Sequence, residues 1–203
     1  TTNTHDTILF FTNKGKVYRS KGYEIPEYGR AAKGLPIINL LEIDKDEWVN
    51  AIIPVTEFKE DNYLFFTTKY GISKRSPLTS FANIRNNGLI ALGLKEGDEL
   101  ISVRLTDGSK DIIIGTKNGL MIRFPETDVR SMGRTATGVK GITLRKDDEV
   151  IGMELLNSDE EILIVTKNGY GKRTNEKEYR IQSRGGKGIK TCNITDKTGS
   201  LVA

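Results

Sequence analysis

Residues 112–119 read Ile-Ile-Ile-Gly-Thr-Lys-Asn-Gly, and residues 162–169 read Ile-Leu-Ile-Val-Thr-Lys-Asn-Gly. Each stretch is an apolar run rich in β-branched residues, and a short second run that ends in arginine follows it. Asn-Gly between two such runs is the strongest short-range signal for a β-hairpin, because a two-residue turn of this kind needs positive φ angles at both positions. The sequence therefore predicts hairpins that turn at Asn118-Gly119 and at Asn168-Gly169.

The same pattern occurs four times along the chain, with turn glycines 56, 48 and 50 residues apart, at Gly15, Gly71, Gly119 and Gly169. A basic loop follows each hairpin, and an acidic turn that leads into a strand follows the first three loops. Four-stranded units of about this length are typical of propeller-like rings, in which neighbouring sheets supply the core to one another. We therefore expect an all-β fold without long helices. The predicted repeats span residues 7–61, 62–110, 111–160 and 161–203 of a single complete or partial domain.

The composition excludes membrane and secreted proteins. The chain has 203 residues, of which 36% are apolar and 29% charged, as in ordinary globular proteins. No apolar run approaches the roughly 18 residues that a membrane helix needs. The first residues lack the basic and then apolar pattern of a secretory signal. We expect a cytoplasmic protein that does not contact a membrane.

The residues of common catalytic and metal sites are scarce. The chain has one cysteine, Cys192, and one histidine, His5, so zinc sites and Cys-His or Ser-His-Asp chemistry are excluded. Gly185-Gly186-Lys187-Gly188 lacks the Ser or Thr that follows the lysine of a phosphate-binding loop. Asp147-Asp148 lacks the spaced oxygen ligands of a calcium site. We expect no catalytic residue, metal or cofactor on this chain.

The distribution of charge, rather than the net charge of +4, points to a ligand. Basic residues recur at equivalent places in the hairpins and loops, whereas acidic residues gather in the third element and in the connectors. In a ring of blades equivalent positions fall on one rim, and a curved row of cations suits an elongated polyanion such as duplex DNA. The predicted DNA-binding residues are Lys14, Arg19, Arg30, Lys33, Lys74, Arg75, Arg85, Arg123, Arg134, Lys140, Lys172, Arg173, Arg184 and Lys187.

Two other interpretations of the basic residues are open. Lysine and arginine at strand ends often only solvate a sheet edge and block aggregation. A propeller that binds a protein partner is the alternative from another class; it predicts salt-tolerant binding and an exposed apolar patch, of which the sequence gives no sign. Aromatic residues do not alternate with the basic loops, which favours duplex DNA over single strands.

Three segments carry a resemblance to a known family: Leu9–Gly15, Gly133–Ile142 and Asn168–Thr174. On these segments the chain resembles the C-terminal DNA-wrapping domain of the DNA gyrase A protein, most closely the Gram-positive type, with the corresponding domain of topoisomerase IV as a near relative. The resemblance implies a β-pinwheel, a six-bladed propeller variant with strand exchange, of which about four repeats are present. It also implies that duplex DNA bends around the basic rim to support ATP-dependent negative supercoiling. The implied partners are double-stranded DNA, the remainder of the gyrase A protein, and the gyrase B protein in a heterotetramer that holds the catalytic residues elsewhere.

The family's Gln-Arg-Arg-Gly-Gly-x-Gly box has a near match in the fourth repeat. Gln182, Arg184, Gly185, Gly186, Lys187 and Gly188 match the box, and Ser183 departs from it. We interpret the match as a degenerate later copy, because the box itself belongs to the first blade. DNA contact is carried over for Arg184 and Lys187 without the special role of the box. This near match and the segment Gly133–Ile142 favour gyrase over topoisomerase IV.

Overall fold

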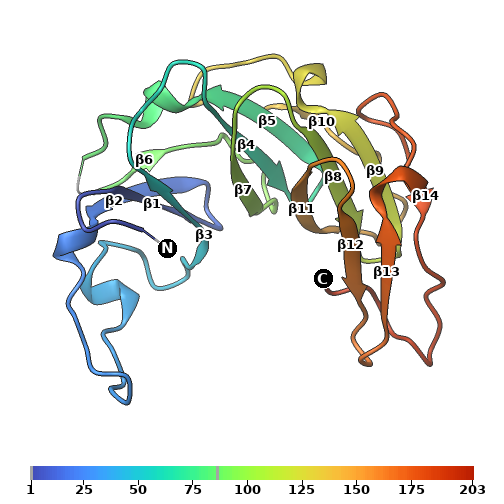
Figure 1. The fold of residues 1–203 in the computed structure, drawn as a ribbon, viewed down its shortest axis with the longest axis horizontal. Coiled ribbons are helices and arrows are strands. Elements are labelled where there is room, and N and C mark those ends of the chain that lie inside the picture. Colours follow the sequence, from blue (N-terminus) through green and yellow to red (C-terminus); the bar gives the residue numbers. More distant parts are fainter. Residues whose placement is uncertain (1, 86) are drawn as a thin grey trace.

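The computed structural model describes residues 2–85 and 87–203, which form four antiparallel β-sheets arranged as the blades of an open arch (Figure 1). The strands that each blade takes from its own repeat are β1 (Thr7–Thr12), β2 (Lys16–Lys21) and β3 (Val49–Val55) in blade 1; β4 (Tyr63–Thr68), β5 (Ile72–Pro77) and β7 (Leu100–Thr106) in blade 2; β8 (Asp111–Thr116), β9 (Leu120–Pro125) and β11 (Val150–Leu156) in blade 3; and β12 (Glu161–Val165) and β13 (Gly171–Asn175) in blade 4. The helical segments are short 3-10 turns, namely η1 (Gly22–Glu24), η2 (Ile37–Asn39), η3 (Leu78–Phe81), η4 (Glu126–Asp128) and η5 (Glu176–Glu178). The predicted all-β class is confirmed.

Neighbouring blades exchange strands. The short strands β6 (Leu89–Ile90), β10 (Val139–Lys140) and β14 (Ile189–Lys190) each come from the basic loop of one repeat and pair with the hairpin of the repeat before it. They form the outer edges of blades 1, 2 and 3, whereas β3, β7 and β11 lie on the concave side of the arch (Figure 1). The pinwheel architecture is thereby confirmed, and blades 1, 2 and 3 each span parts of two sequence repeats.

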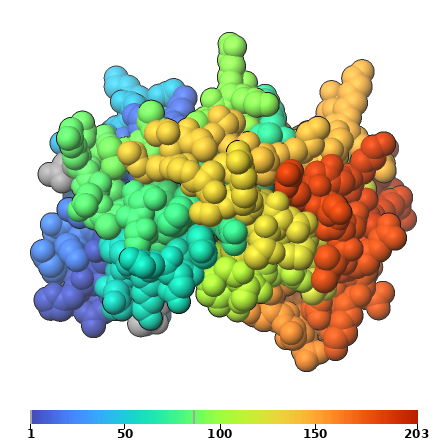
Figure 2. Space-filling view, turned by 90° about the horizontal axis from the view of Figure 1, so that it is seen from above, coloured from blue at the N-terminus to red at the C-terminus, as the bar shows by residue number. Residues whose placement is uncertain are grey.

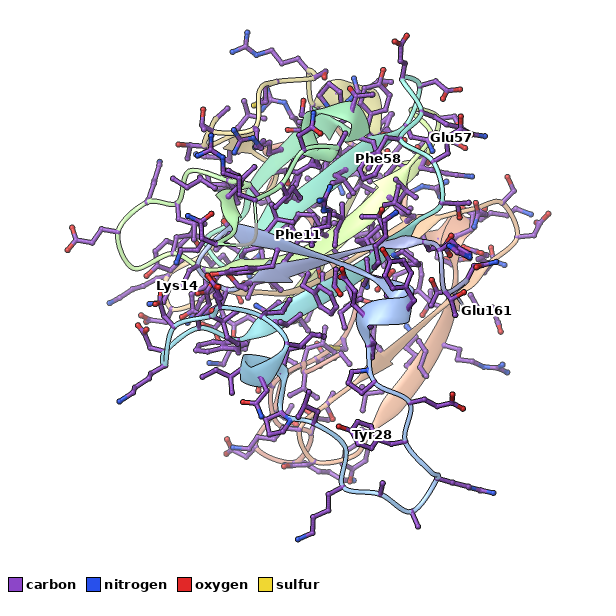
Figure 3. The ribbon with its side chains drawn as sticks, turned by 90° about the vertical axis from the view of Figure 1, so that its left-hand side faces the viewer. Phe11, Lys14, Tyr28, Glu57, Phe58 and Glu161 are labelled. Atoms are coloured by element: carbon purple, nitrogen blue, oxygen red, sulfur yellow. The ribbon has the colours of Figure 1, made fainter. Side chains whose placement is uncertain are left out.

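Three hydrophobic cores lie between neighbouring blades, and a smaller one, which contains Phe10 and Tyr18, lies between blade 1 and the loop of its own repeat. Phe11 of blade 1 meets Phe66 of blade 2 edge-on, with 5.6 Å between the ring centroids. Phe65 of blade 2 packs against Phe124 of blade 3 in the next core, and Ile164 of blade 4 belongs to the third. In blades 1, 2 and 3 the first strand of the hairpin is an almost continuous apolar run with both faces covered, whereas Leu163 of β12 in blade 4 is exposed. In blade 1, Phe11 lies among the neighbouring side chains, well inside the fold (Figure 3).

The hairpin turns are one residue longer than predicted. Gly119 has a φ of +78° and donates its N–H to the Thr116 carbonyl at 3.0 Å, whereas Asn118 does not adopt a positive φ. A three-residue loop at 117–119 therefore uses a turn of ordinary handedness followed by one left-handed glycine, the usual solution for hairpins of this length. The prediction of positive φ at both Asn and Gly is wrong, because the glycine alone makes the left-handed step.

The turn glycine is also the point where the exchanged strand docks. The Gly119 carbonyl accepts the Thr191 N–H at 2.9 Å, and a Cβ on Gly119 would lie 2.8 Å from the Cys192 carbonyl oxygen. Among the described residues no exchanged strand docks at Gly169 of blade 4, and a Cβ there would meet nothing within 4 Å. The two glycines share their backbone conformation, with φ of +78° and +83°, and differ in the close approach of another segment.

We expect Gly119→Ala to destabilise the chain more than Gly169→Ala. Both variants force alanine into the left-handed region, which costs about 1–2 kcal/mol. Gly119→Ala also pushes the exchanged strand outward, and overpacking of this kind costs a further ~1–3 kcal/mol. Urea unfolding of the two variants measures the difference. Equal losses would mean that the exchanged strand shifts without resistance.

Candidate nucleic-acid interface

Three crossing segments, residues 82–95, 129–146 and 179–195, carry the exchanged strands over the convex face of the arch. Each ends against the hairpin turn of the preceding blade; in the first, the Leu92 N–H donates to the Gly15 carbonyl at 3.1 Å. Adjacent crossing segments also bond to each other, since the Gly93 N–H donates to Ala136 at 3.3 Å and the Gly185 N–H donates to Gly141 at 2.6 Å. Figure 2 shows the green, gold and red segments side by side across this face. They form one continuous curved surface.

The crossing segments contain eleven lysines and arginines and no aspartate or glutamate. Two of these cations, Arg134 and Arg184, are half-buried, and the other nine are exposed. Six of the eleven are not among the predicted residues; they are Lys95, Arg130, Arg145, Lys146, Arg180 and Lys190. The absence of acidic residues over each whole segment is a sequence signal that would have identified them.

Arg134 and Arg184 bridge adjacent crossing segments at equivalent places. Arg134 Nη1 donates to the Ile90 carbonyl at 3.0 Å, and Arg184 Nη1 donates to the Lys140 carbonyl at 3.1 Å. Arg184 Nε also donates to the Asp128 carbonyl, at 2.9 Å. A guanidinium has five N–H donors, so both side chains keep donors for an anion while these bonds hold them in place.

The arginines in the second hairpin strands of blades 2 and 3, Arg75 in β5 and Arg123 in β9, point into the joints between blades. Arg75 Nη1 lies 3.8 Å from Oε2 of the buried Glu126, and the Arg75 guanidinium lies 4.7 Å from the centroid of the Tyr63 ring. Arg123 pairs with Glu176 and, at 2.8 Å, with Asp111. Their side chains are only 12% and 15% exposed.

The prediction that Arg75 and Arg123 lie on the DNA-binding surface is therefore corrected. Glu126 and Glu176 are the first residues of η4 and η5, so each arginine pins the 3-10 turn of the following blade. The buried carboxylates are the physical reason, because a guanidinium that compensates a buried charge is not available to an external phosphate.

The prediction that Lys74 binds DNA is also corrected, because the Lys74 side chain is fully buried. Its Nζ donates to the Ala91 carbonyl at 2.6 Å and to the Arg134 carbonyl, and it lies 5.1 Å from the centroid of the Phe66 ring. Burial, with a smaller contribution from the nearby charge of Arg134, lowers the pKa of Lys74 to about 7. Lys74 therefore holds two crossing segments on blade 2 from below and does not reach the surface.

The buried ammonium makes stability depend on pH. The unfolded chain holds the Lys74 proton up to about pH 10.4, whereas the folded chain releases it near pH 7, so the free energy of unfolding rises between these values. We expect Lys74→Met to remove from this window a slope of at most about 1.4 kcal/mol per pH unit. Lys172→Met, at the equivalent and exposed position of β13, is the control and retains the wild-type slope. Urea unfolding at several pH values checks this; parallel curves for wild type and Lys74→Met would contradict it.

The remaining predicted cations are exposed but are not all on the convex face. Lys14, in the first hairpin turn (Figure 3), pairs with Asp46 at 2.7 Å. Arg30 and Lys33 belong to the loop that carries Tyr28 away from blade 1 (Figure 3). Arg85, Lys140 and Lys187 are exposed on the crossing segments. Arg19 is exposed on β2, and Lys172 and Arg173 are exposed on β13.

The residues of the degenerate box form the centre of the third crossing segment. Gly185 and Gly188 have φ of +79° and +73°, and a Cβ on Gly188 would lie 2.7 Å from the Met121 carbonyl oxygen. Gly186 lies against Ile122 of the same strand, and a Cβ there would be 3.3 Å from its side chain. These glycines let the segment lie close to β9 while Lys187 stays exposed.

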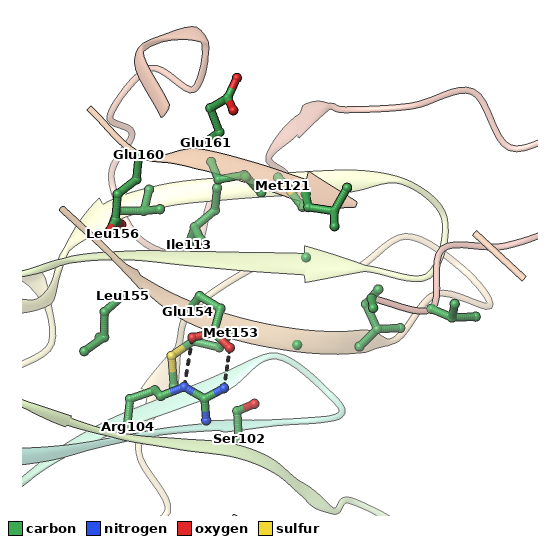
Figure 4. A pocket seen from close by; sticks show the side chains of 17 residues that line it. Ser102, Arg104, Ile113, Met121, Met153, Glu154, Leu155, Leu156, Glu160 and Glu161 are labelled. Carbon is green, nitrogen blue, oxygen red and sulfur yellow. Dashed lines mark hydrogen bonds and ion pairs between the residues drawn. The ribbon is translucent and has the colours of Figure 1, made fainter. Parts of the chain in front are cut away.

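A cavity of about 610 Å³ lies between β11 and β12 (Figure 4). Apolar side chains such as Ile113 and Met121 line it, and its Arg104 and Glu154 are already paired, with Nε to Oε2 at 2.9 Å. In blades 1, 2 and 3 a third strand (β3, β7 or β11) pairs with the first strand of the hairpin. On the corresponding side of β12 in blade 4, the Val165 N–H donates to the Ala203 carbonyl.

The part of the chain that the structure describes offers neither a metal centre nor a membrane span. Within residues 2–85 and 87–203, no three His, Cys, Asp or Glu side chains are grouped so that they could hold a metal ion. Over the same residues, no helix is both long enough and apolar enough to cross a bilayer. The basic convex face is therefore the feature that carries a functional interpretation.

The chain matches the family described as DNA gyrase C-terminal domain, beta-propeller, over residues 6–56, 62–107, 110–157 and 160–203. It is 76% identical over all 203 residues to the DNA gyrase A protein of Halalkalibacterium halodurans, and it spans 24% of that relative's length. Two solved structures are similar to 98% of the chain. A C-terminal domain of DNA topoisomerase IV has a TM-score of 0.90 at 31% identity, with 62% of it covered. A DNA gyrase A C-terminal domain has a TM-score of 0.81 at 29% identity, with 64% covered.

Proposed function

Because the chain belongs to the DNA gyrase C-terminal domain family, we propose that it binds double-stranded DNA along its convex face and bends the duplex around the arch. The observation that carries this proposal is the uninterrupted positive charge of the crossing segments, eleven cations without one carboxylate side chain. Contacts to phosphates position a duplex without reading its sequence. Their arrangement on a curved surface favours a bent path.

The energetics of bending fit a surface of this kind. Bending a site of 20–30 base pairs by 40–90° costs of order 1–6 kcal/mol. A hydrogen bond to a charged group contributes about 1.5–3 kcal/mol, so a few phosphate contacts offset that cost. Arg134 and Arg184 are already held by the Ile90 and Lys140 carbonyls, so little side-chain ordering opposes the contact.

The chain spans about a quarter of its curated gyrase relative, so the activity of a whole enzyme is part of the proposal. We propose that the chain acts in the cytoplasm with the remainder of the gyrase A protein and with the gyrase B protein, where wrapping supports ATP-dependent negative supercoiling. The catalytic residues would lie outside this chain. The identity of 76% to a gyrase protein favours gyrase over topoisomerase IV.

Duplexes of increasing length, labelled at both ends and titrated with the 203-residue chain across a salt series, test the proposal. We expect binding that strengthens with length, weakens steeply with salt, and draws the two labels together, since each phosphate contact releases counterions. Binding without approach of the labels would contradict wrapping by this chain. No binding at low salt would contradict DNA binding and favour a propeller that binds protein.

A further inference from the structure

Three arginines from three different repeats line one pocket on the convex face. The pocket has a volume of about 420 Å³, and its lining consists of Arg19, Asn83, Ile84, Arg85, Leu89 and Arg134. No carboxylate is part of that lining. We propose that this pocket is a discrete phosphate-binding site, and, as a refinement of the proposed function, that it takes a phosphate of the DNA backbone.

Arg19 is available for this role because the joint between blades 1 and 2 has a leucine where the next two joints have a glutamate. The first residue of the 3-10 turn that follows the hairpin is Glu126 in blade 3 and Glu176 in blade 4, but it is Leu78 in blade 2. Arg75 and Arg123 are therefore neutralised within their joints. Arg19, at the equivalent position of blade 1, faces no such carboxylate.

Within residues 2–85 and 87–203, Arg19 forms no salt bridge. Among the described residues, its hydrogen bond is to a neutral group, the Ala82 carbonyl, which accepts from Nη1 at 3.2 Å. Glu24, the carboxylate whose pKa its charge helps to lower, is itself engaged by the Ser20 hydroxyl at 2.9 Å and the Lys21 N–H at 2.7 Å. An exposed guanidinium with free donors beside two others is a favourable anion site.

The Arg134 side of the pocket is fixed before any ligand arrives. Arg134 Nη1 donates to the Ile90 carbonyl at 3.0 Å, and the buried Lys74 ammonium donates to the carbonyl of Arg134 itself. Lys74 also holds Ala91, at 2.6 Å, at the end of the first crossing segment. Donors that are already ordered lose less entropy on binding, which favours affinity for a small anion.

The lining also limits what the pocket takes. It holds no aromatic side chain on which a base could stack, so recognition of a nucleobase is not expected. The shared chemistry is a phosphate oxyanion, which comes either from the DNA backbone or from free phosphate. The two sources are separated by titrating each one alone.

Nuclear magnetic resonance of the arginine Nε–Hε groups tests the site with inorganic phosphate and, separately, with a 12-base-pair duplex. We expect the signals of Arg19, Arg85 and Arg134 to shift together and saturate with each ligand, at much lower concentration with the duplex. Arg19→Gln should weaken phosphate binding about tenfold or more, because one charge-assisted hydrogen bond is lost. The matched control is Lys59→Gln, an exposed cation outside both the crossing segments and the pocket lining, which should leave phosphate binding unchanged.

Each outcome decides between the two proposals. Unsaturated shifts of all arginines with phosphate, or equal effects of Arg19→Gln and Lys59→Gln on both ligands, would overturn the pocket while duplex bending by the wild type keeps the proposed function. Saturation with phosphate without any duplex binding at low salt would keep the site and overturn both the DNA source and the proposed function. Leu78→Glu restores the carboxylate that blades 3 and 4 have and should weaken phosphate binding; Arg19→Gln carries the test if that buried substitution prevents folding.

Discussion

Replacement of Arg134 and Arg184 by glutamate is expected to abolish DNA bending and to weaken duplex binding by about a hundredfold or more at low salt. On the proposed DNA path each substitution replaces a cation that would face the duplex with an anion, and charge-assisted contacts to phosphate contribute about 1.5–3 kcal/mol each. Each lost phosphate contact also lowers the slope of log affinity against log salt by about 0.9. The end-labelled duplexes described above measure affinity, bending and slope together.

The matched control is a chain in which Lys59 and Lys177 become glutamate. This pair changes the net charge by the same amount, and both side chains are exposed outside the crossing segments. We expect a small loss of affinity from the altered net charge and unchanged bending. Equal loss in the two chains would show that net charge alone drives binding, which would contradict a defined DNA path over the convex face.

Arg123→Met is expected to destabilise the chain by about 3–5 kcal/mol, because removal of one partner leaves a buried carboxylate without compensation. That carboxylate belongs to Glu176, whose exposed fraction is 4%. The double variant Arg123→Met, Glu176→Leu should recover most of the loss, because an apolar pair often replaces a buried ion pair at little cost. Blade 2 already has leucine, Leu78, at this place.

Urea unfolding of the single and double variants measures this recovery. Arg173→Met is the control, since Arg173 is the equivalent arginine in β13 of blade 4 and its side chain is 70% exposed next to Glu161. We expect a change within about 0.5 kcal/mol for an exposed pair. If the double variant were as unstable as Arg123→Met alone, the loss would come from the packing of methionine and not from the orphaned charge of Glu176.

The repeat pattern was sufficient to predict an all-β fold of four propeller-like units, whereas the exchange of strands between blades was implied only by the resemblance to a family. Apolar runs such as 8–11 and 112–114 have no polar face, so they must be covered on both sides, and the inter-blade cores confirm that expectation. The turn conformation at Asn118-Gly119 was not predicted, because the loop length that selects the turn depends on where strand pairing stops. The pairing stops at Gly115 and Met121, which no local signal announces.

The candidate interface was predicted only in part, because equivalent positions in a repeat do not have equivalent neighbours. Lys74 and Lys172 occupy the same place in their hairpins, yet a crossing segment covers the first and none covers the second. Likewise, Arg19 and Arg123 differ through Leu78 and Glu176, which lie in the following repeat. Such differences come from contacts between repeats, which a pattern along one repeat does not contain.

Strand exchange has a mechanical consequence for a bent polymer held on the convex face. A crossing segment is covalently part of one blade and hydrogen-bonded to the hairpin of the preceding blade, as β10 is to β5. A straightening duplex that pulls on this segment therefore loads two blades at once, and the Gly93–Ala136 and Gly185–Gly141 bonds pass the load to the next segments. The arch should resist uncurling as a single elastic spring, with its stiffness shared along the row, and not as four bodies hinged at independent joints.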